Sequence, residues 1–136
     1  MSDNDSATKH RRYFEYLEQQ DDSTFFTAGA CHIFALELHR RYGYPLYLVE
    51  RERGQVTHVY CIRRGRPFDV RTDIVSLRYF FECYPGKSRE ITEDELLSLF
   101  TGNNWNRKYG LWGEPSFVKR AIERAKQMID IPAYAP

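Results

Sequence analysis

The sequence lacks the features that would place it outside the ordinary class of globular proteins. Its 136 residues contain no apolar run that approaches about 18 residues, so we expect no membrane-spanning helix. The first residues, MSDNDSATKHRR, lack the apolar segment of a cleaved secretory signal. The three cysteines are an odd number, so they imply no disulfide framework and leave at least one thiol free. These absences predict a cytoplasmic protein, or one exported without a cleaved signal peptide.

The chain also carries little net charge. A formal charge of +1 gives no broad positive field, which argues against a nucleic-acid partner or an acidic membrane surface. The length and the hydrophobic content of 42% suit one globular domain with a real core. We expect residues 1–8 to be disordered and residues 9–136 to form that domain.

Periodicity and turn residues predict an α+β fold, in which a cysteine-bearing helix packs on a small antiparallel sheet with flanking helices. Helices are expected at residues 9–20, from Gly29 or Ala30 to Gly43, from the capping box TEDE to residue 100, and from Pro115 onward. Strands are expected at 46–50, 56–62 and 67–71. Residues 74–84 fit either a helix or a buried strand, and we expect loops or turns at 21–24, 85–88 and 101–113.

Cys31 occupies an unusual place in this pattern, because it falls in the first turn of the helix that begins near Gly29. Backbone N–H groups without partners and the positive end of the helix dipole both lower a thiol pKa at such a position. The same N–H groups can hold an oxyanion. The position therefore suits a nucleophile, although a lone free cysteine is more often a small core residue.

His58 lies in VTHVYCI, a β-branched and aromatic stretch that predicts a strand. If Arg64 and Gly65 form a two-residue turn, the next strand pairs so that Tyr60 faces Asp69. Side chains two residues apart share a face, so His58 and Asp69 then lie on the same side as diagonal neighbours. A shift of the register by one residue would separate them. Given that turn, the pattern predicts a histidine oriented by an aspartate.

Other readings of these residues stay open at this point. Cys31, His32, His58 and Cys61 could hold zinc, but no CxxC pair supports this and we expect no metal or cofactor. Cys61 and Cys83 are expected in the core, with Cys61 pointing away from His58. Arginines at 51, 53, 63, 64 and 66 suit solvated hairpin tips or a patch for an anionic partner. Trp105 and Trp112 could fill the core or wall a substrate groove, and His32 is expected to border the same cleft.

The stretch from Gly29 to Thr72 resembles the catalytic core of transglutaminase-like and, more broadly, papain-like cysteine enzymes. The matching residues are Gly29-Ala30-Cys31, Phe34-Ala35, Leu38, Gly43-Tyr44-Pro45, THVYC with His58, and FDVRT with Asp69 and Thr72. The resemblance implies a papain/transglutaminase-like fold with Cys31 as nucleophile, His58 as general base and acid, and Asp69 as the orienting carboxylate. It implies no cofactor.

The implied activity is cysteine-dependent cleavage or transfer at an amide bond of a protein or peptide, through a thioester. Peptidase, amidase and transglutaminase activities all fit, and a bacterial or phage effector is one candidate role. Trp105, Trp112 and His32 are the candidate substrate-binding residues. The sequence departs from papain relatives at His32, where they often carry Trp, and in lacking the upstream Gln of their oxyanion hole. The alternative is a catalytically inactive module of this fold that binds a protein partner.

Overall fold

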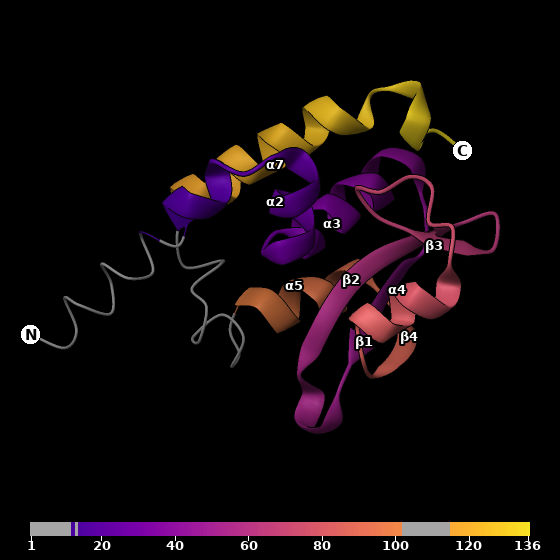
Figure 1. Cartoon of the computed structure of the whole chain (residues 1–136). Helices are drawn as coiled ribbons and strands as arrows, with labels where there is room; N and C mark the ends of the chain where they lie inside the picture. The colour runs from indigo at the N-terminus through magenta and orange to yellow at the C-terminus, as the bar shows by residue number, and fades with distance from the viewer. Residues whose placement is uncertain (1–11, 13, 102–114) are drawn as a thin grey trace, which may run out of the picture.

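The structure is a computed structural model, and it describes residues 12, 14–101 and 115–136. A four-stranded antiparallel sheet in the order β3-β2-β1-β4 forms its centre (Figure 1). The strands are β1 (Leu46–Glu50), β2 (Val56–Arg63), β3 (Arg66–Phe68) and β4 (Lys87–Ile91). The helices are α2 (Asp22–Ala28), α3 (Cys31–Tyr42), α4 (Leu77–Cys83), α5 (Glu93–Thr101) and α7 (Pro115–Ile129), with short 3-10 helices η1 (Glu52–Gly54) and η2 (Pro132–Tyr134).

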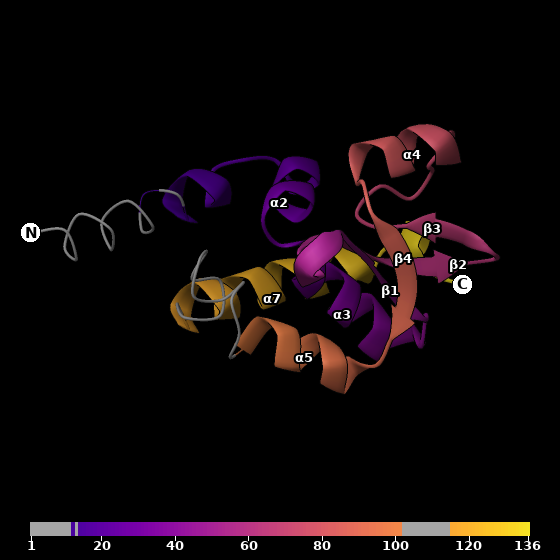
Figure 2. The same cartoon turned by 90° about the horizontal axis from the view of Figure 1, so that it is seen from below.

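The two faces of the sheet carry two separate apolar clusters. Leu46 and Leu48 of β1 join the main core, whereas Tyr47 and Val49 belong to a smaller cluster with Phe80 of α4. Because neighbouring side chains in a strand point to opposite faces, α3 and α4 cover opposite sides of the sheet. Figure 2 shows α4 apart from α3, α5 and α7.

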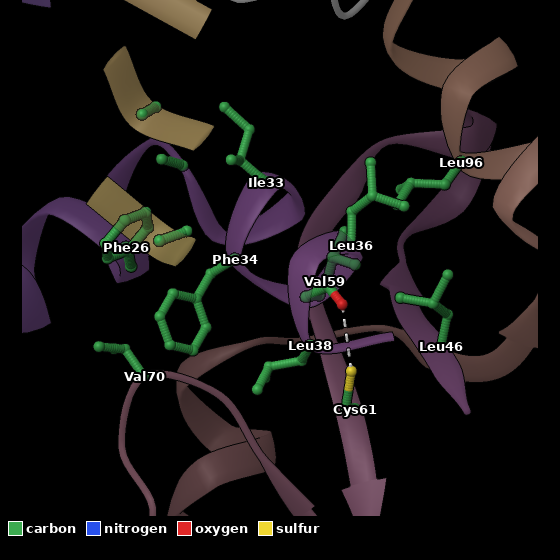
Figure 3. Packing of buried hydrophobic residues seen from close by; sticks show 14 of the residues in the cluster. Phe26, Ile33, Phe34, Leu36, Leu38, Leu46, Val59, Cys61, Val70 and Leu96 are labelled. Atoms are coloured by element: carbon green, nitrogen blue, oxygen red, sulfur yellow. Dashed lines mark hydrogen bonds between the residues drawn. The ribbon is translucent and has the colours of Figure 1, made fainter. Parts of the chain in front are cut away.

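The main core lies where α3 packs between the sheet and α7. Its members are almost fully buried, and Figure 3 labels Phe26, Ile33, Phe34, Leu36, Leu38, Leu46, Val59, Cys61, Val70 and Leu96. The Cys61 thiol donates to the backbone oxygen of Ala35 at 3.4 Å, so the only polar group of that side chain has a partner. Cys61 is therefore a core residue, as its position in β2 predicted.

Local signals in the sequence placed several boundaries correctly. Helix α3 begins at Cys31 and ends at Tyr42, where Gly43 caps it with a φ of 78°, the left-handed conformation that glycine adopts readily. In the predicted capping box, the Thr92 hydroxyl accepts from the N–H of Glu95, whose carboxylate accepts from the N–H of Thr92. The predicted hairpin register is also confirmed, because Arg63 pairs with Arg66 around the turn.

Other expectations were wrong. Residues 22–24, expected in a loop, form the first turn of α2, and Asp21 caps that helix by accepting from the N–H of Thr24. Residues 87 and 88, expected in a turn, belong to β4, a polar edge strand that pairs with β1. Cys83, expected in the core, is exposed at the end of α4. The segment 74–84, which fitted either a helix or a strand, is largely helical because α4 spans Leu77–Cys83.

In the described part of the chain, no helix is long and apolar enough to cross a membrane. The expected disorder of residues 1–8 and the expected loop after Thr101 fall mainly outside the described residues.

Candidate active site

Cys31 begins helix α3, with Ala30 as its N-cap, and its side chain is partly exposed. The thiol interacts with the rings of His58 and His32. Burial disfavours the thiolate, but the charge of His58 and hydrogen bonding with His32 and His58 outweigh this and lower the pKa of Cys31 to about 6. At neutral pH the sulfur is therefore mostly a thiolate.

His58 lies on β2 and is fully buried. Its Nε2 lies 2.7 Å from Oδ2 of Asp69, which leaves Nδ1 for the thiol of Cys31. Nδ1 is buried and makes no hydrogen bond of ordinary geometry within the described residues. The ring nevertheless interacts with Cys31 through its charge and through weaker hydrogen bonding. Burial opposes the imidazolium, but Cys31 and Asp69 overcome it and raise the pKa of His58 to about 9. Between these two pKa values, the thiolate–imidazolium pair is the favoured state.

Asp69 follows the last residue of β3, and the strand predicted over 67–71 stops before it. Its Oδ1 accepts the backbone N–H of Arg71 at 2.9 Å, a local turn that takes the chain out of the ladder. The predicted ladder pairs of Tyr60 with Asp69 and of His58 with Arg71 are therefore absent. The side chains of His58 and Asp69 still meet. The pairing of β3 with residues 61–63 of β2 brings the chain to Asp69 close to the part of β2 that carries His58.

The early end of β3 also shapes the site. Because β3 pairs only with residues 61–63, the first half of β2 has no strand beside it on that side in the described structure. His58 lies in this half of β2 and contacts the Asp69 carboxylate there. The short third strand therefore leaves the edge of β2 at His58 without a paired strand in the described part of the chain.

Asp69 is buried, and Arg71 holds it as a carboxylate. The Nε of Arg71 donates to Oδ1 at 2.9 Å, and its Nη2 donates to Oδ2. Burial raises the pKa of Asp69, but the hydrogen bonds and charges of Arg71 and His58 lower it to about 2. The same pairing raises the pKa of the Arg71 guanidinium. Asp69 is therefore ionised throughout the physiological pH range.

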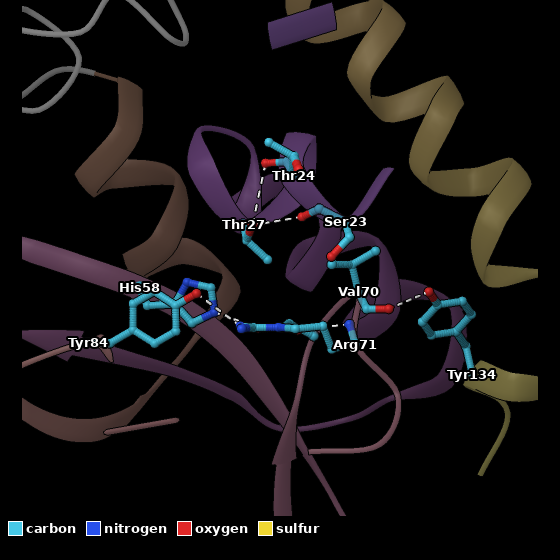
Figure 4. Close-up of polar contacts among 9 residues, drawn as sticks. Ser23, Thr24, Thr27, His58, Val70, Arg71, Tyr84 and Tyr134 are labelled. Carbon is cyan, nitrogen blue, oxygen red and sulfur yellow. Dashed lines mark hydrogen bonds and ion pairs between the residues drawn. The ribbon is translucent and has the colours of Figure 1, made fainter. Parts of the chain in front are cut away.

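The sequence did not single out Tyr84, which caps the C-terminus of α4. Its ring is stacked on the imidazole of His58 with centroids 3.8 Å apart and planes at 6° (Figure 4). Its hydroxyl accepts from Nη2 of Arg71 at 2.9 Å. Tyr84 is 26 residues from His58, in the segment of ambiguous secondary structure, so no local pattern in the sequence connects the two.

The C-terminal segment holds the loop that carries Asp69. The hydroxyl of Tyr134 donates to the backbone oxygen of Val70 at 2.7 Å, and Figure 4 shows this contact beside the site. Arg63 of β2 donates to the backbone oxygens of Ala133 and Thr72, which joins the same two segments. The position of the carboxylate therefore depends on contacts with the far end of the chain.

The predicted substrate-binding residues have different outcomes. His32 is buried, with 1% of its side chain exposed, and it contributes to the low pKa of Cys31. Its contact with a substrate stays a prediction. Trp105 and Trp112 lie outside the described residues.

The alternative zinc grouping weighed from the sequence does not assemble. Cys61 points into the main core and bonds Ala35, whereas His58 belongs to the opposite side of the sheet with Asp69 and Tyr84. Among the described residues, no group of three or more histidine, cysteine or carboxylate side chains could hold a metal ion.

No family model, curated protein or solved structure matches the chain. The geometry of the site therefore carries the functional argument. A thiol of low pKa, a coupled imidazole and a buried carboxylate form an arrangement that can activate a sulfur nucleophile and return its proton to a leaving group.

Proposed function

We propose that the protein is a cysteine-dependent enzyme that hydrolyses or transfers an acyl group at an amide bond of a protein or peptide. Cys31 is the nucleophile, His58 the general base and acid, and Asp69 the carboxylate that orients His58. The observation that carries the proposal is the position of His58, whose Nε2 is bonded to Asp69 at 2.7 Å. The ring of His58, together with His32, lowers the pKa of the Cys31 thiol to about 6.

The reaction follows from these charges. The Cys31 thiolate attacks the carbonyl carbon, and a C–S bond forms. As the C–N bond breaks, the His58 imidazolium gives its Nδ1 proton to the departing amine, which leaves a thioester. Neutral His58 then takes a proton from water or from a second amine, which attacks the thioester and releases the thiolate. Water yields an acid, and an amine yields a new amide.

The start of α3 supports this chemistry in a second way. The first N–H groups of a helix have no partner within it, and Cys31 is the first residue of α3. They can stabilise the negative oxygen of the tetrahedral intermediate without the upstream Gln of papain relatives. The order of Cys helix, His strand and Asp segment, together with an antiparallel sheet, supports a papain/transglutaminase-like fold as part of the same proposal.

Thiol reactivity tests the assignment of Cys31. Iodoacetamide should alkylate Cys31 rapidly at pH 6.5, and His58→Ala should slow that reaction about tenfold or more. Peptide mapping by mass spectrometry separates Cys31 from the exposed Cys83, and Cys83→Ser is the matched control that should leave the Cys31 rate unchanged. Equal rates in the wild type and His58→Ala would refute the assignment.

A second experiment tests the reaction itself. A library of protein-derived peptides is incubated with the wild type and with Cys31→Ala, and mass spectrometry detects new termini. Added hydroxylamine should convert the thioester to a hydroxamate at the same positions. Products that do not depend on Cys31 would contradict the proposal, and an excess of amide over acid in the presence of an amine would identify a transferase.

One observation favours the second candidate, an inactive module that binds a protein partner. Four large apolar side chains near α4 are exposed in the described structure: Val75, Leu77, Tyr79 and Phe81. Contiguous exposed apolar surface often marks an interaction site. If this alternative is correct, iodoacetamide would alkylate Cys31 no faster in the wild type than in His58→Ala, and no peptide of the library would be modified.

A further inference from the structure

The side chains around His58 form a closed ring of contacts that extends beyond the proposed triad. His58 bonds Asp69, Asp69 bonds Arg71, Arg71 bonds Tyr84, and Tyr84 is stacked on His58. Helix α4 supplies a second aromatic contact through Phe80, whose ring meets the imidazole at 5.7 Å and 70°. The stacked ring of Tyr84 therefore fixes the plane of the imidazole, and the Asp69 carboxylate fixes the direction of its Nε2.

The charges of this ring and of the neighbouring Cys31 are balanced in the reactive state. The Cys31 thiolate and the Asp69 carboxylate carry two negative charges, and the His58 imidazolium and the Arg71 guanidinium carry two positive ones. Arg71 keeps Asp69 ionised and at the same time fixes the hydroxyl of Tyr84. An aromatic face stacked on a cation stabilises its charge, most strongly where water is excluded. The Tyr84 ring therefore favours the protonated form of His58.

We infer that Tyr84 and Arg71 are positioning residues for the proposed catalytic base: Tyr84 stabilises the His58 imidazolium by stacking, and Arg71 locks Tyr84 and Asp69 together. This inference rests on the proposed function. It gives α4 a role in the site, because Tyr84 caps this helix and Phe80 within it contacts the same imidazole. A merely structural tyrosine would affect stability without changing the titration of His58 or Cys31.

The test measures titration rather than stability alone. Tyr84→Leu keeps an apolar cover over the imidazole but removes the aromatic face. The NMR chemical shifts of His58 should give a pKa about one unit lower than in the wild type, with the Cys31 midpoint about one unit higher. The rate of Cys31 alkylation at pH 6 should then fall about fivefold.

Two conservative variants keep the experiment decisive if Tyr84→Leu fails to fold. Tyr84→Phe retains the stack and loses only the hydroxyl, so its alkylation rate at pH 6 should fall about twofold. Arg71→Lys keeps the charge but loses the fork that joins Asp69 to Tyr84, and a similar fall is expected. Tyr79→Leu is the matched control, because Tyr79 lies on the same helix, is 66% exposed and is not among the rings packed on His58.

The outcomes separate this inference from the proposed function. If Tyr84→Leu and Tyr79→Leu leave the His58 and Cys31 titrations equally unchanged while His58→Ala abolishes rapid alkylation, Tyr84 has no positioning role and the proposed function stands. If His58→Ala leaves alkylation unchanged, the proposed function itself fails. A shift in Tyr84→Leu that Tyr84→Phe largely restores supports the inference.

Discussion

Nε2 of His58 lies 2.7 Å from Oδ2 of Asp69, and neither side chain is more than 2% exposed. A contact of this kind, away from water, fixes which ring nitrogen carries the proton when the imidazole is neutral, because only a protonated Nε2 can donate to the carboxylate. On the proposed mechanism, Nδ1 is then the nitrogen that exchanges a proton with the sulfur of Cys31.

Asp69→Asn should therefore impair both reactivity and stability. An asparagine cannot balance the charge of His58 and Arg71, so the His58 pKa should fall and the Cys31 pKa should rise. Removing one partner from a buried charged pair typically costs about 3 kcal/mol in the free energy of unfolding. Urea unfolding and the alkylation rate of Cys31 at pH 6.5 measure the two effects.

The pH dependence of that stability loss provides the check. The pKa of Asp69 is 3.8 before perturbation and about 2 in the fold, so its stabilising contribution is complete above pH 3.8 and is lost as the pH falls through about 2. The difference in stability between the wild type and Asp69→Asn should shrink over that range. A difference that stays constant from pH 5 to pH 2 would show that the carboxylate charge is not its source.

On the proposed function, the activity of the wild type should follow a bell-shaped pH profile. The acid limb should lie near pH 6, where the Cys31 thiol loses its proton, and the alkaline limb near pH 9, where His58 loses its proton. Because the two groups are coupled, both values belong to the pair. The ultraviolet absorbance of the thiolate, taken as the difference between the wild type and Cys31→Ser, measures the acid limb without any substrate.

The acid limb has its own control. In His58→Ala, the thiolate should appear only at distinctly higher pH, because the stabilising charge is gone. A wild-type absorbance change centred above pH 8 would mean that the thiol is not coupled to His58.

Short-range signals explain what the sequence predicted about this site. A two-residue turn at Arg64 and Gly65, both with positive φ, fixes the β2–β3 register, and that register determines which side chains share a face. Gly43 ends the cysteine helix for an equally local reason, because it adopts the left-handed conformation. These features depend on a few neighbouring residues and can be inferred without knowing the rest of the chain.

The features that sequence reasoning missed depend on tertiary contacts, or lie in segments whose composition is not typical of the structure they adopt. Strand β4 is polar and exposed along most of its length, so it has no alternating apolar pattern, and its strand conformation comes from pairing with β1. The stack of Tyr84 on His58 joins segments far apart in the chain. Asp69 shows both cases, since local register brings it near His58 while Tyr134, from the far end of the chain, holds the neighbouring Val70.

Tyr134→Phe should loosen the loop that carries Asp69. The Tyr134 hydroxyl donates to Val70 at 2.7 Å in a buried position, so its loss leaves that carbonyl without this donor. We expect a decrease of about 1–2 kcal/mol in the free energy of unfolding, together with a slower alkylation of Cys31 at pH 6.5. Tyr16→Phe changes an exposed tyrosine and is the control, which should alter neither quantity measurably. A stability loss without any change in Cys31 would mean that Val70 does not help to position Asp69.

Gly86→Ala should disturb the connection between Tyr84 and β4. Gly86 has a φ of +137°, and a Cβ there would lie 2.4 Å from the backbone oxygen of Glu50. Because this contact is with backbone, β4 must shift away from β1, and we expect a loss of at least about 2 kcal/mol in the free energy of unfolding.

Gly54→Ala is the matched control for this change. Gly54 also has a positive φ, of +72°, but a Cβ there meets nothing within 4 Å, so only the conformational cost of about 1 kcal/mol is expected. Because Gly86 is two residues from Tyr84, Gly86→Ala should also raise the Cys31 midpoint, whereas Gly54→Ala should not. Equal losses of stability in the two variants would show that the close approach of Gly86 to Glu50 does not hold β4 in place, and would leave the position of Tyr84 dependent on α4 alone.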